Sequence, residues 1–123
     1  MPLSADQVSA LCKIGFYATH VLRNANLYMN AYRASIMDDL TALYSRKHAF
    51  EIIDELCLSG TPCSLIMLDI DDFKLYNELY GSKEGDHLIQ RCAKIILSAL
   101  HEDDMAFRFG SDEFLILRHG SDV

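Results

Sequence analysis

The run from Cys63 to Ile70 constrains the fold more than any other part of the sequence. It reads Cys-Ser-Leu-Ile-Met-Leu-Asp-Ile, which is mostly apolar at both odd and even positions and has the length of one β-strand. Residues 59–62, Ser-Gly-Thr-Pro, end a helix before it, and Asp71 and Asp72 follow it directly. The pattern predicts a strand that is covered on both faces and ends in carboxylates, within a mixed α/β fold.

Helical and strand patterns alternate on either side of this run. Apolar residues three and four apart indicate helices, and Gly110-Ser111-Asp112 has the length of a hairpin turn between two strands. Asp38 and Asp39 can cap a short turn before the first of these helices. The expected elements are helices at 45–58, 72–79 and 86–100, a loop at 80–85, and strands at 63–70, 105–109 and 113–118.

A long helix is expected at the N-terminus. Ser4 and Gln7 have the spacing of a capping box, and a seam with a 3.5-residue period favours a parallel coiled-coil dimer through residues 8–36. A second apolar stripe leaves an alternative open, in which residues 4–25 pack on a core outside this chain. The domains are expected at 1–37 and 38–123. The seam comprises Val8, Leu11, Gly15, Ala18, Leu22, Ala25, Met29, Tyr32 and Ile36, and the second stripe comprises Ile14, Tyr17, Val21 and Tyr28.

Composition limits the ligands that the chain can take. Its 123 residues suit one domain with a core, and only six glycines and two prolines argue against a disordered chain. Eleven basic residues against 18 acidic ones give a net charge of −7, which excludes a typical nucleic-acid polymer binder. Any anionic ligand therefore needs a metal ion or locally placed cations.

The cysteine pattern and the hydropathy bear on location. Cys12, Cys57, Cys63 and Cys92 form no CxxC pair and have apolar neighbours, which predicts reduced thiols in the core. No stretch is apolar for long enough to span a membrane, and the N-terminus lacks the pattern of a signal peptide. We therefore expect a cytoplasmic protein without a membrane segment.

Two acidic clusters are the candidates for chemistry. One is Asp69-Ile-Asp71-Asp72 at the end of the apolar run, and the other is Asp112-Glu113 in the hairpin turn. Carboxylates that a sheet brings together suit a hard cation such as Mg²⁺, which needs only one or two protein carboxylates when phosphates complete its shell. The alternative is that these residues cap helices and lie in turns.

Several strings occur in a characteristic order: Asp39-Leu-Thr-Ala-Leu-Tyr-Ser-Arg46, Leu68-Asp-Ile-Asp-Asp-Phe-Lys74, Asn77, Tyr80-Gly81, Gly85-Asp86 and Arg108-Phe-Gly-Ser-Asp-Glu-Phe114. Together they resemble the GGDEF family of diguanylate cyclases from about residue 38 to 118. The segment from Leu3 to Tyr28 is similar to the closing helix of a GAF sensor domain. The resemblance implies a ferredoxin-like nucleotidyl-cyclase palm, an α/β (α+β) fold, after a long signalling helix.

The resemblance also implies a reaction. Two GTP-loaded domains face each other, and each 3′-hydroxyl attacks the other nucleotide's α-phosphate to give cyclic di-GMP and pyrophosphate. By position, Asp69 and Asp112 would hold Mg²⁺ or Mn²⁺ with the carbonyl of Ile70. Glu113 would be the acidic residue near the metal and the reacting hydroxyl, so Asp112 and Glu113 are the expected catalytic pair.

Substrate-binding residues follow from the same comparison. Phe73 and Lys74 would line the triphosphate, Asn77 and Asp86 would read guanine, and Leu40 would form an apolar wall to the base. Each position has a structural alternative: Phe73 and Leu40 as core, Asn77 and Asp86 as helix caps, and Lys74 as a solvated cation.

Some positions depart from the family pattern. The second glycine of the signature is Ser111, and a Cβ there is expected to strain the turn if the backbone needs a positive φ. The alternative function is therefore a degenerate, non-catalytic domain that binds GTP or cyclic di-GMP and regulates a partner, and a third is a purely structural dimerising role. Ser45 and Ala42 replace an Asn and a Gly in the first motif, and we expect both to be tolerated.

Two further departures concern regulation and completeness. His101 stands where the family's inhibitory Arg-x-x-Asp has arginine, while Asp104 is kept, so we expect weak or no product inhibition through this site. The family fold continues with further helices and a strand beyond the position of Val123. We therefore expect a fragment of a longer sensor–cyclase, inactive by itself, whose strand at 65–70 lies at an open sheet edge.

Overall fold

The computed structural model describes residues 1–120 and divides into two compact units. The first unit is Met1–Ala34 and the second begins at Ser35. The end of the predicted second domain, at residue 123, lies outside the described residues.

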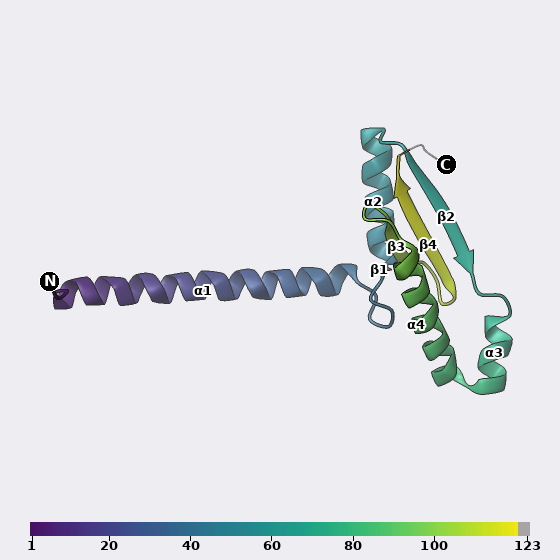
Figure 1. Ribbon diagram of the computed structural model, residues 1–123, viewed down its shortest axis with the longest axis horizontal. Coiled ribbons are helices and arrows are strands. Elements are labelled where there is room, and N and C mark those ends of the chain that lie inside the picture. The colour runs from purple at the N-terminus through teal and green to yellow at the C-terminus, as the bar shows by residue number, and fades with distance from the viewer. Residues whose placement is uncertain (121–123) are drawn as a thin grey trace. The chain divides into compact units, whose positions relative to one another are not determined.

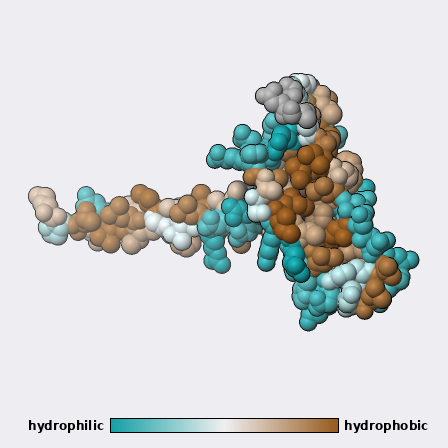
Figure 2. All heavy atoms as spheres, turned by 45° about the vertical axis from the view of Figure 1, so that its right-hand side comes forward, coloured by the Kyte–Doolittle hydropathy of each residue, from teal (hydrophilic) through white to brown (hydrophobic). Residues whose placement is uncertain are grey.

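The N-terminal unit is one continuous helix, α1 (Ala5–Ile36), whose last two residues enter the second unit. The predicted capping box is confirmed: the Ser4 amide donates to Gln7 Oε1 at 2.9 Å, and the Gln7 amide donates to Ser4 Oγ at 3.3 Å. No residue of α1 is buried. Figure 2 shows apolar side chains of this helix on the surface, and Leu11, Phe16 and Leu22 are each more than half exposed.

The second unit is built on a four-stranded sheet in the order β1-β3-β4-β2 (Figure 1). β1 (Tyr44–Ser45) is parallel to β3 (Met105–Arg108), and β4 (Glu113–His119) is antiparallel to both β3 and β2 (Cys63–Asp69). The three strands predicted at these places are confirmed, with their ends shifted by one residue. The mixed α+β class is confirmed as well.

Two helices cover opposite faces of this sheet. On β4, Phe114 and Ile116 pack with α4 (Ser82–Ala99), whereas Leu115 and Leu117 pack with α2 (Arg46–Ser59). The alternation follows from the two-residue period of a strand. The buried cluster on the α4 side is Leu43, Ile89, Ala93, Ile96, Ala106 and Phe114, and the cluster on the α2 side is Ala49, Leu56, Phe107, Leu115 and Leu117.

A single residue, Gly81, connects α3 (Phe73–Tyr80) with α4, so the predicted loop at 80–85 is wrong. Gly81 has φ +88°, a conformation that lets the chain reverse within one residue, and its amide donates to the Asn77 carbonyl at 2.8 Å. As a result α4 begins at Ser82 rather than Asp86. Asp86 therefore lies within the helix and is not its N-cap.

β2 lies at an edge of the sheet, and the prediction that it is covered on both faces is wrong. It pairs with β4 only, and the side chains of Leu65, Ile66, Met67 and Leu68 are 38–53% exposed. The apolar sequence reads as a buried strand, but nothing among the described residues covers its outer edge. The edge position itself is as predicted, and Figure 2 shows apolar surface over this unit.

The cysteines are free, as predicted, but three of the four are not in the core. Cys92, on α4, is half-buried, while Cys12, Cys57 and Cys63 are exposed. These three lie on α1, near the end of α2 and at the start of the edge strand, where no neighbouring element covers them. Within residues 1–120, no helix is both long and apolar enough to cross a membrane.

Candidate functional site

The sheet register brings the two acidic clusters together. Asp69, the last residue of β2, lies opposite Glu113, the first residue of β4. One residue further on, the Ile70 amide donates to the Asp112 carbonyl at 3.1 Å. The sequence-predicted metal residues, 43 positions apart along the chain, are therefore neighbours at one end of the sheet.

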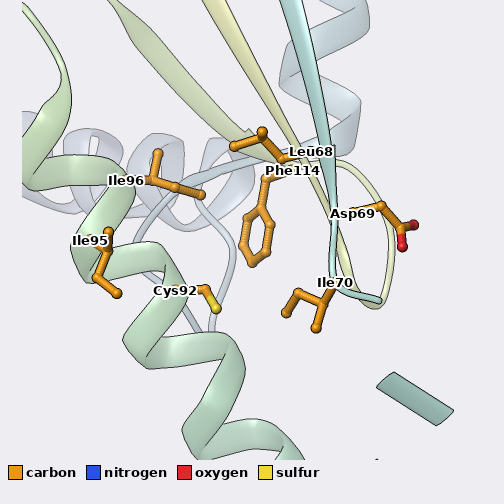
Figure 3. Close-up of a pocket in the computed structure, with 7 residues that line it drawn as sticks. All are labelled: Leu68, Asp69, Ile70, Cys92, Ile95, Ile96 and Phe114. Carbon is orange, nitrogen blue, oxygen red and sulfur yellow. The ribbon is translucent and has the colours of Figure 1, made fainter. Parts of the chain in front are cut away.

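The Asp69 carboxylate lies outside the hydrophobic pocket beside it. Figure 3 shows it pointing away from Ile70 and Phe114, which project toward α4. The pocket has a volume of about 210 Å³ and is lined mainly by apolar side chains. None of the predicted base- and phosphate-binding side chains lines it. The lining residues are Leu68, Asp69, Ile70, Cys92, Ile95, Ile96 and Phe114.

The oxygen atoms at this sheet end fit a hard cation. Asp69 is exposed, Asp112 and Glu113 are half-buried, and Ser111 Oγ donates to Asp112 Oδ1 at 3.0 Å. In the part of the chain that the structure describes, no three Asp, Glu, His or Cys side chains gather into a complete metal cage. Mg²⁺ does not need one, because it takes one or two carboxylates and keeps phosphate and water ligands.

The expected strain at Ser111 is absent. Ala42 and Asp72 are the non-glycine residues with positive φ among those described, so Ser111 has a backbone that any residue can adopt. At Gly110 a Cβ would lie 2.5 Å from Glu113 Oε2, the mobile end of that side chain, and 3.2 Å from its Cβ, so the Glu113 side chain would have to shift. The turn at residues 109–112, named the signature turn, therefore accommodates serine at the second glycine position without backbone strain.

Asn77 and Gly85 form a close contact between α3 and α4. The Asn77 Oδ1 atom is buried and has no hydrogen-bond partner, and a Cβ at Gly85 would overlap the Asn77 amide. The cap interpretation of the Asn77 side chain is therefore wrong, since only its backbone carbonyl binds Gly81. A buried polar atom without a partner is costly, which makes it a candidate for ligand contact.

The other predicted substrate residues differ in their surroundings. Leu40 and Phe73 are half-buried and pack against the core cluster on the α4 side, and the Leu40 carbonyl accepts from Gln90 Nε2 at 3.2 Å. Lys74 and Asp86 are exposed. The structure therefore places Leu40 and Phe73 against one cluster, in agreement with their alternative role as core residues.

Two paired arginines were not predicted from the sequence, Arg108 next to the signature turn and Arg118 near the opposite end of β4. Arg108 contacts the Asp38 carboxylate and donates from Nη2 to the Ser111 carbonyl at 3.1 Å. Arg118 donates from Nε and Nη2 to Asp104, at 3.0 and 2.8 Å. The Arg118 hydrogen bond, with one from the His101 amide, lowers the pKa of Asp104 from 3.8 to about 2. The two arginines lie 70 and 14 positions from their aspartate partners, so the pairs become visible only in the folded chain.

Comparison with known proteins now defines the family. The family model for the diguanylate cyclase GGDEF domain matches residues 35–122, which is most of the chain. The chain therefore belongs to the GGDEF family of diguanylate cyclase domains. Its resemblance to that family, inferred from the motifs, is confirmed, whereas the GAF-like character of the first helix stays a prediction.

Individual relatives agree with this assignment. The chain is 32% identical to the diguanylate cyclase DgcS of Shewanella oneidensis over 98% of its length, covering 42% of that protein. It is 30% identical to the response regulator PleD of Caulobacter vibrioides, covering 94% of the chain and 27% of the relative. The chain thus spans less than half the length of these relatives.

Solved structures share the fold. The coiled coil and GGDEF domain of DgcB from Caulobacter crescentus, in complex with c-di-GMP, has a TM-score of 0.81 and 27% identity over 93% of this chain and 62% of that one. A structure of the GGDEF domain of the same protein, also in complex with c-di-GMP, has a TM-score of 0.66 and 32% identity. The match covers 71% of this chain and 52% of that one. The nucleotidyl-cyclase palm expected from the motifs is the fold found.

Proposed function

We propose that this chain is the cyclase part of a diguanylate cyclase, which makes cyclic di-GMP from two GTP molecules in bacterial signalling. The observation that carries the proposal is the juxtaposition of Asp69 with Glu113 and of Ile70 with Asp112 at one sheet end. Family membership of residues 35–122 gives this acidic site its chemical context.

Metal binding is the first proposed role of the site. Asp69, Asp112 and the Ile70 carbonyl would hold Mg²⁺ or Mn²⁺, with Glu113 beside them. The ion would neutralise charge on the phosphates and make the attacking 3′-hydroxyl more acidic. The Ser111 hydroxyl supports this role by donating to Asp112 Oδ1, which fixes the direction of that carboxylate.

Recognition of guanine is the second proposed role. The buried Oδ1 of Asn77 has no partner within the described residues, and Asp86 follows Gly85 on the facing helix. Asp86 would accept hydrogen bonds from guanine N1–H and the exocyclic amine, which adenine cannot offer. Leu40 and Phe73 would contact the base and the phosphate side of the nucleotide, and Lys74 would supply a positive charge.

Assembly of two copies is part of the proposal, because each GTP must meet a second one. The exposed apolar side chains of α1 support pairing of two helices through residues 8–36. The DgcB structure named above contains a coiled coil beside its GGDEF domain. Since the reaction consumes GTP, we propose that it takes place in the cytoplasm. Weak product inhibition at Asp104 stays a prediction.

A nucleotide assay tests the proposal. We would incubate the intact protein with GTP and Mg²⁺, and look for cyclic di-GMP by chromatography, with ATP as the control nucleotide. Asp69→Asn should abolish the product, whereas Asp71→Asn, an exposed carboxylate two residues away, should leave most of it. GTP binding without turnover in the intact protein would instead support the non-catalytic regulator, and absence of binding would contradict both.

A further inference from the structure

The guanidinium of Arg46, an exposed residue, makes cation–π contacts with two aromatic rings beside the signature turn. Its central carbon lies 5.0 Å from the ring centre of Phe109 and 5.6 Å from that of Phe50, and the two ring centres are 5.4 Å apart. Arg46 is the first residue of α2, and Phe109 is the first residue of the signature turn. The side chain is therefore held in place beside this turn.

Arg46 also lies toward the face of the sheet that carries the carboxylates. Phe109 packs in the core cluster on the α2 side, and the Phe109 amide donates to the Glu113 carbonyl at 2.8 Å. Glu113 is two residues from Leu115 of that same cluster and lies opposite Asp69. The two-residue period places Asp69 and Glu113 on the α2 side too.

No acidic side chain among the described residues forms an ion pair with Arg46. Arg108 and Arg118, in contrast, are each paired with an aspartate. The five N–H groups of a guanidinium are all donors, and a cation–π contact does not use them up as hydrogen bonds. Arg46 is thus an oriented cation with unused donors, next to a turn whose own side chains are acidic.

We propose that Arg46 binds a phosphate oxygen of the nucleotide at the signature turn. This inference rests on the proposed function. A net charge of −7 disfavours binding of a triphosphate, so a cation beside the signature turn would strengthen binding in addition to the proposed metal ion and Lys74. The planar fork of arginine suits phosphate oxygens, and the two rings keep it oriented before the ligand arrives.

The test measures binding to 3′-deoxy-GTP, which lacks the attacking hydroxyl and therefore cannot react. The intact protein, Arg46→Gln and Lys47→Gln are titrated with this nucleotide and Mg²⁺ by calorimetry, and with guanosine by ligand-observed NMR. Lys47 is the matched control because it is the neighbouring cation but is already paired. Its Nζ lies 3.9 Å from Glu51 Oε1. We expect Arg46→Gln to weaken 3′-deoxy-GTP binding by at least about tenfold, without changing guanosine binding. Lys47→Gln should change neither affinity.

Three results would overturn the inference. Wild-type affinity of a folded Arg46→Gln for 3′-deoxy-GTP would show that the phosphate contact does not exist. Equal losses for 3′-deoxy-GTP and guanosine would show that Arg46 only maintains the structure of the site. If the unaltered protein bound neither ligand, the proposed function itself would fail and the inference with it, which separates that case from the other two.

Discussion

Arg108 and Asp38 join the start of the second unit to the signature turn. Nη1 of Arg108 lies 3.5 Å from both carboxylate oxygens of Asp38, and both side chains are about one-fifth exposed. Asp38 Oδ2 also accepts from the Thr41 amide and hydroxyl, at 3.0 and 2.7 Å. A residue just after α1 is therefore linked through one guanidinium to the carbonyl of Ser111.

This link predicts a stability effect at Asp38. Asp38→Asn keeps an oxygen for Thr41 but removes the charge that faces Arg108, so it should lower the free energy of unfolding by about 1 kcal/mol. Urea unfolding followed by circular dichroism measures the change. Asp39→Asn, at the exposed neighbouring position, should have a smaller effect, and equal effects of the two substitutions would contradict the prediction.

Ala42 carries the backbone strain that was expected at Ser111. Its φ of +58° lies in the left-handed region, at the position where the family has glycine. Ala42→Gly should raise the free energy of unfolding by about 0.5–1 kcal/mol, because relief of the Cβ contact exceeds the entropy that glycine adds to the unfolded chain. Thermal melts check this, and Ala42→Val should lower the midpoint. A midpoint lowered by Ala42→Gly would refute the strain.

Ser111→Gly should not stabilise the protein. Because Ser111 lacks a positive φ, glycine relieves no strain there and adds unfolded-state entropy, so stability should fall by less than about 1 kcal/mol. The same change removes the hydroxyl that donates to Asp112, so binding of Mn²⁺, measured by electron paramagnetic resonance, should weaken. Ser111→Thr retains a hydroxyl and serves as the control. A higher melting point for Ser111→Gly would be evidence for strain after all.

Gly85→Ala should disturb the Asn77 side chain. The new methyl group would occupy the position of the Asn77 amide, so we expect a loss of about 1–3 kcal/mol in unfolding free energy and weaker GTP binding. Gly15→Ala is the control, since a Cβ at Gly15 meets no atom within 4 Å. If Gly85→Ala were as stable as the unaltered protein, the result would contradict the prediction that a methyl group at Gly85 displaces the Asn77 side chain.

The pair of Asp104 and Arg118 predicts a dependence of stability on pH. The pKa of Asp104 falls from 3.8 to about 2 on folding, so its contribution is complete above pH 3.8 and is lost as pH falls toward 2. Asp104→Asn should therefore lose less stability than the unaltered protein between pH 5 and pH 2. Urea midpoints across this range measure the difference, and parallel profiles for the two proteins would contradict it.

Local patterns predicted much of the fold because they depend on neighbouring residues. The capping box at Ser4, the strand that begins at Cys63 and the hairpin-sized turn all follow from spacing and polarity. The predicted start of the helix at Asp86 is wrong because Gly81 alone makes the turn for which the sequence predicts a loop at 80–85. The roles of the predicted site residues stay predictions, although the sheet does bring Asp69 and Glu113 together.

Motifs and periodicity are local properties, so the family, the α+β class and the acidic character of the site can be read from the linear chain. Features that depend on contacts between distant residues needed the packed fold. It placed the apolar strand β2 at an open edge, put Ala42 rather than Ser111 under strain, and set Arg46 over Phe109. Burial, backbone angles and charge pairing are settled by which elements pack together, and a linear pattern does not contain that information.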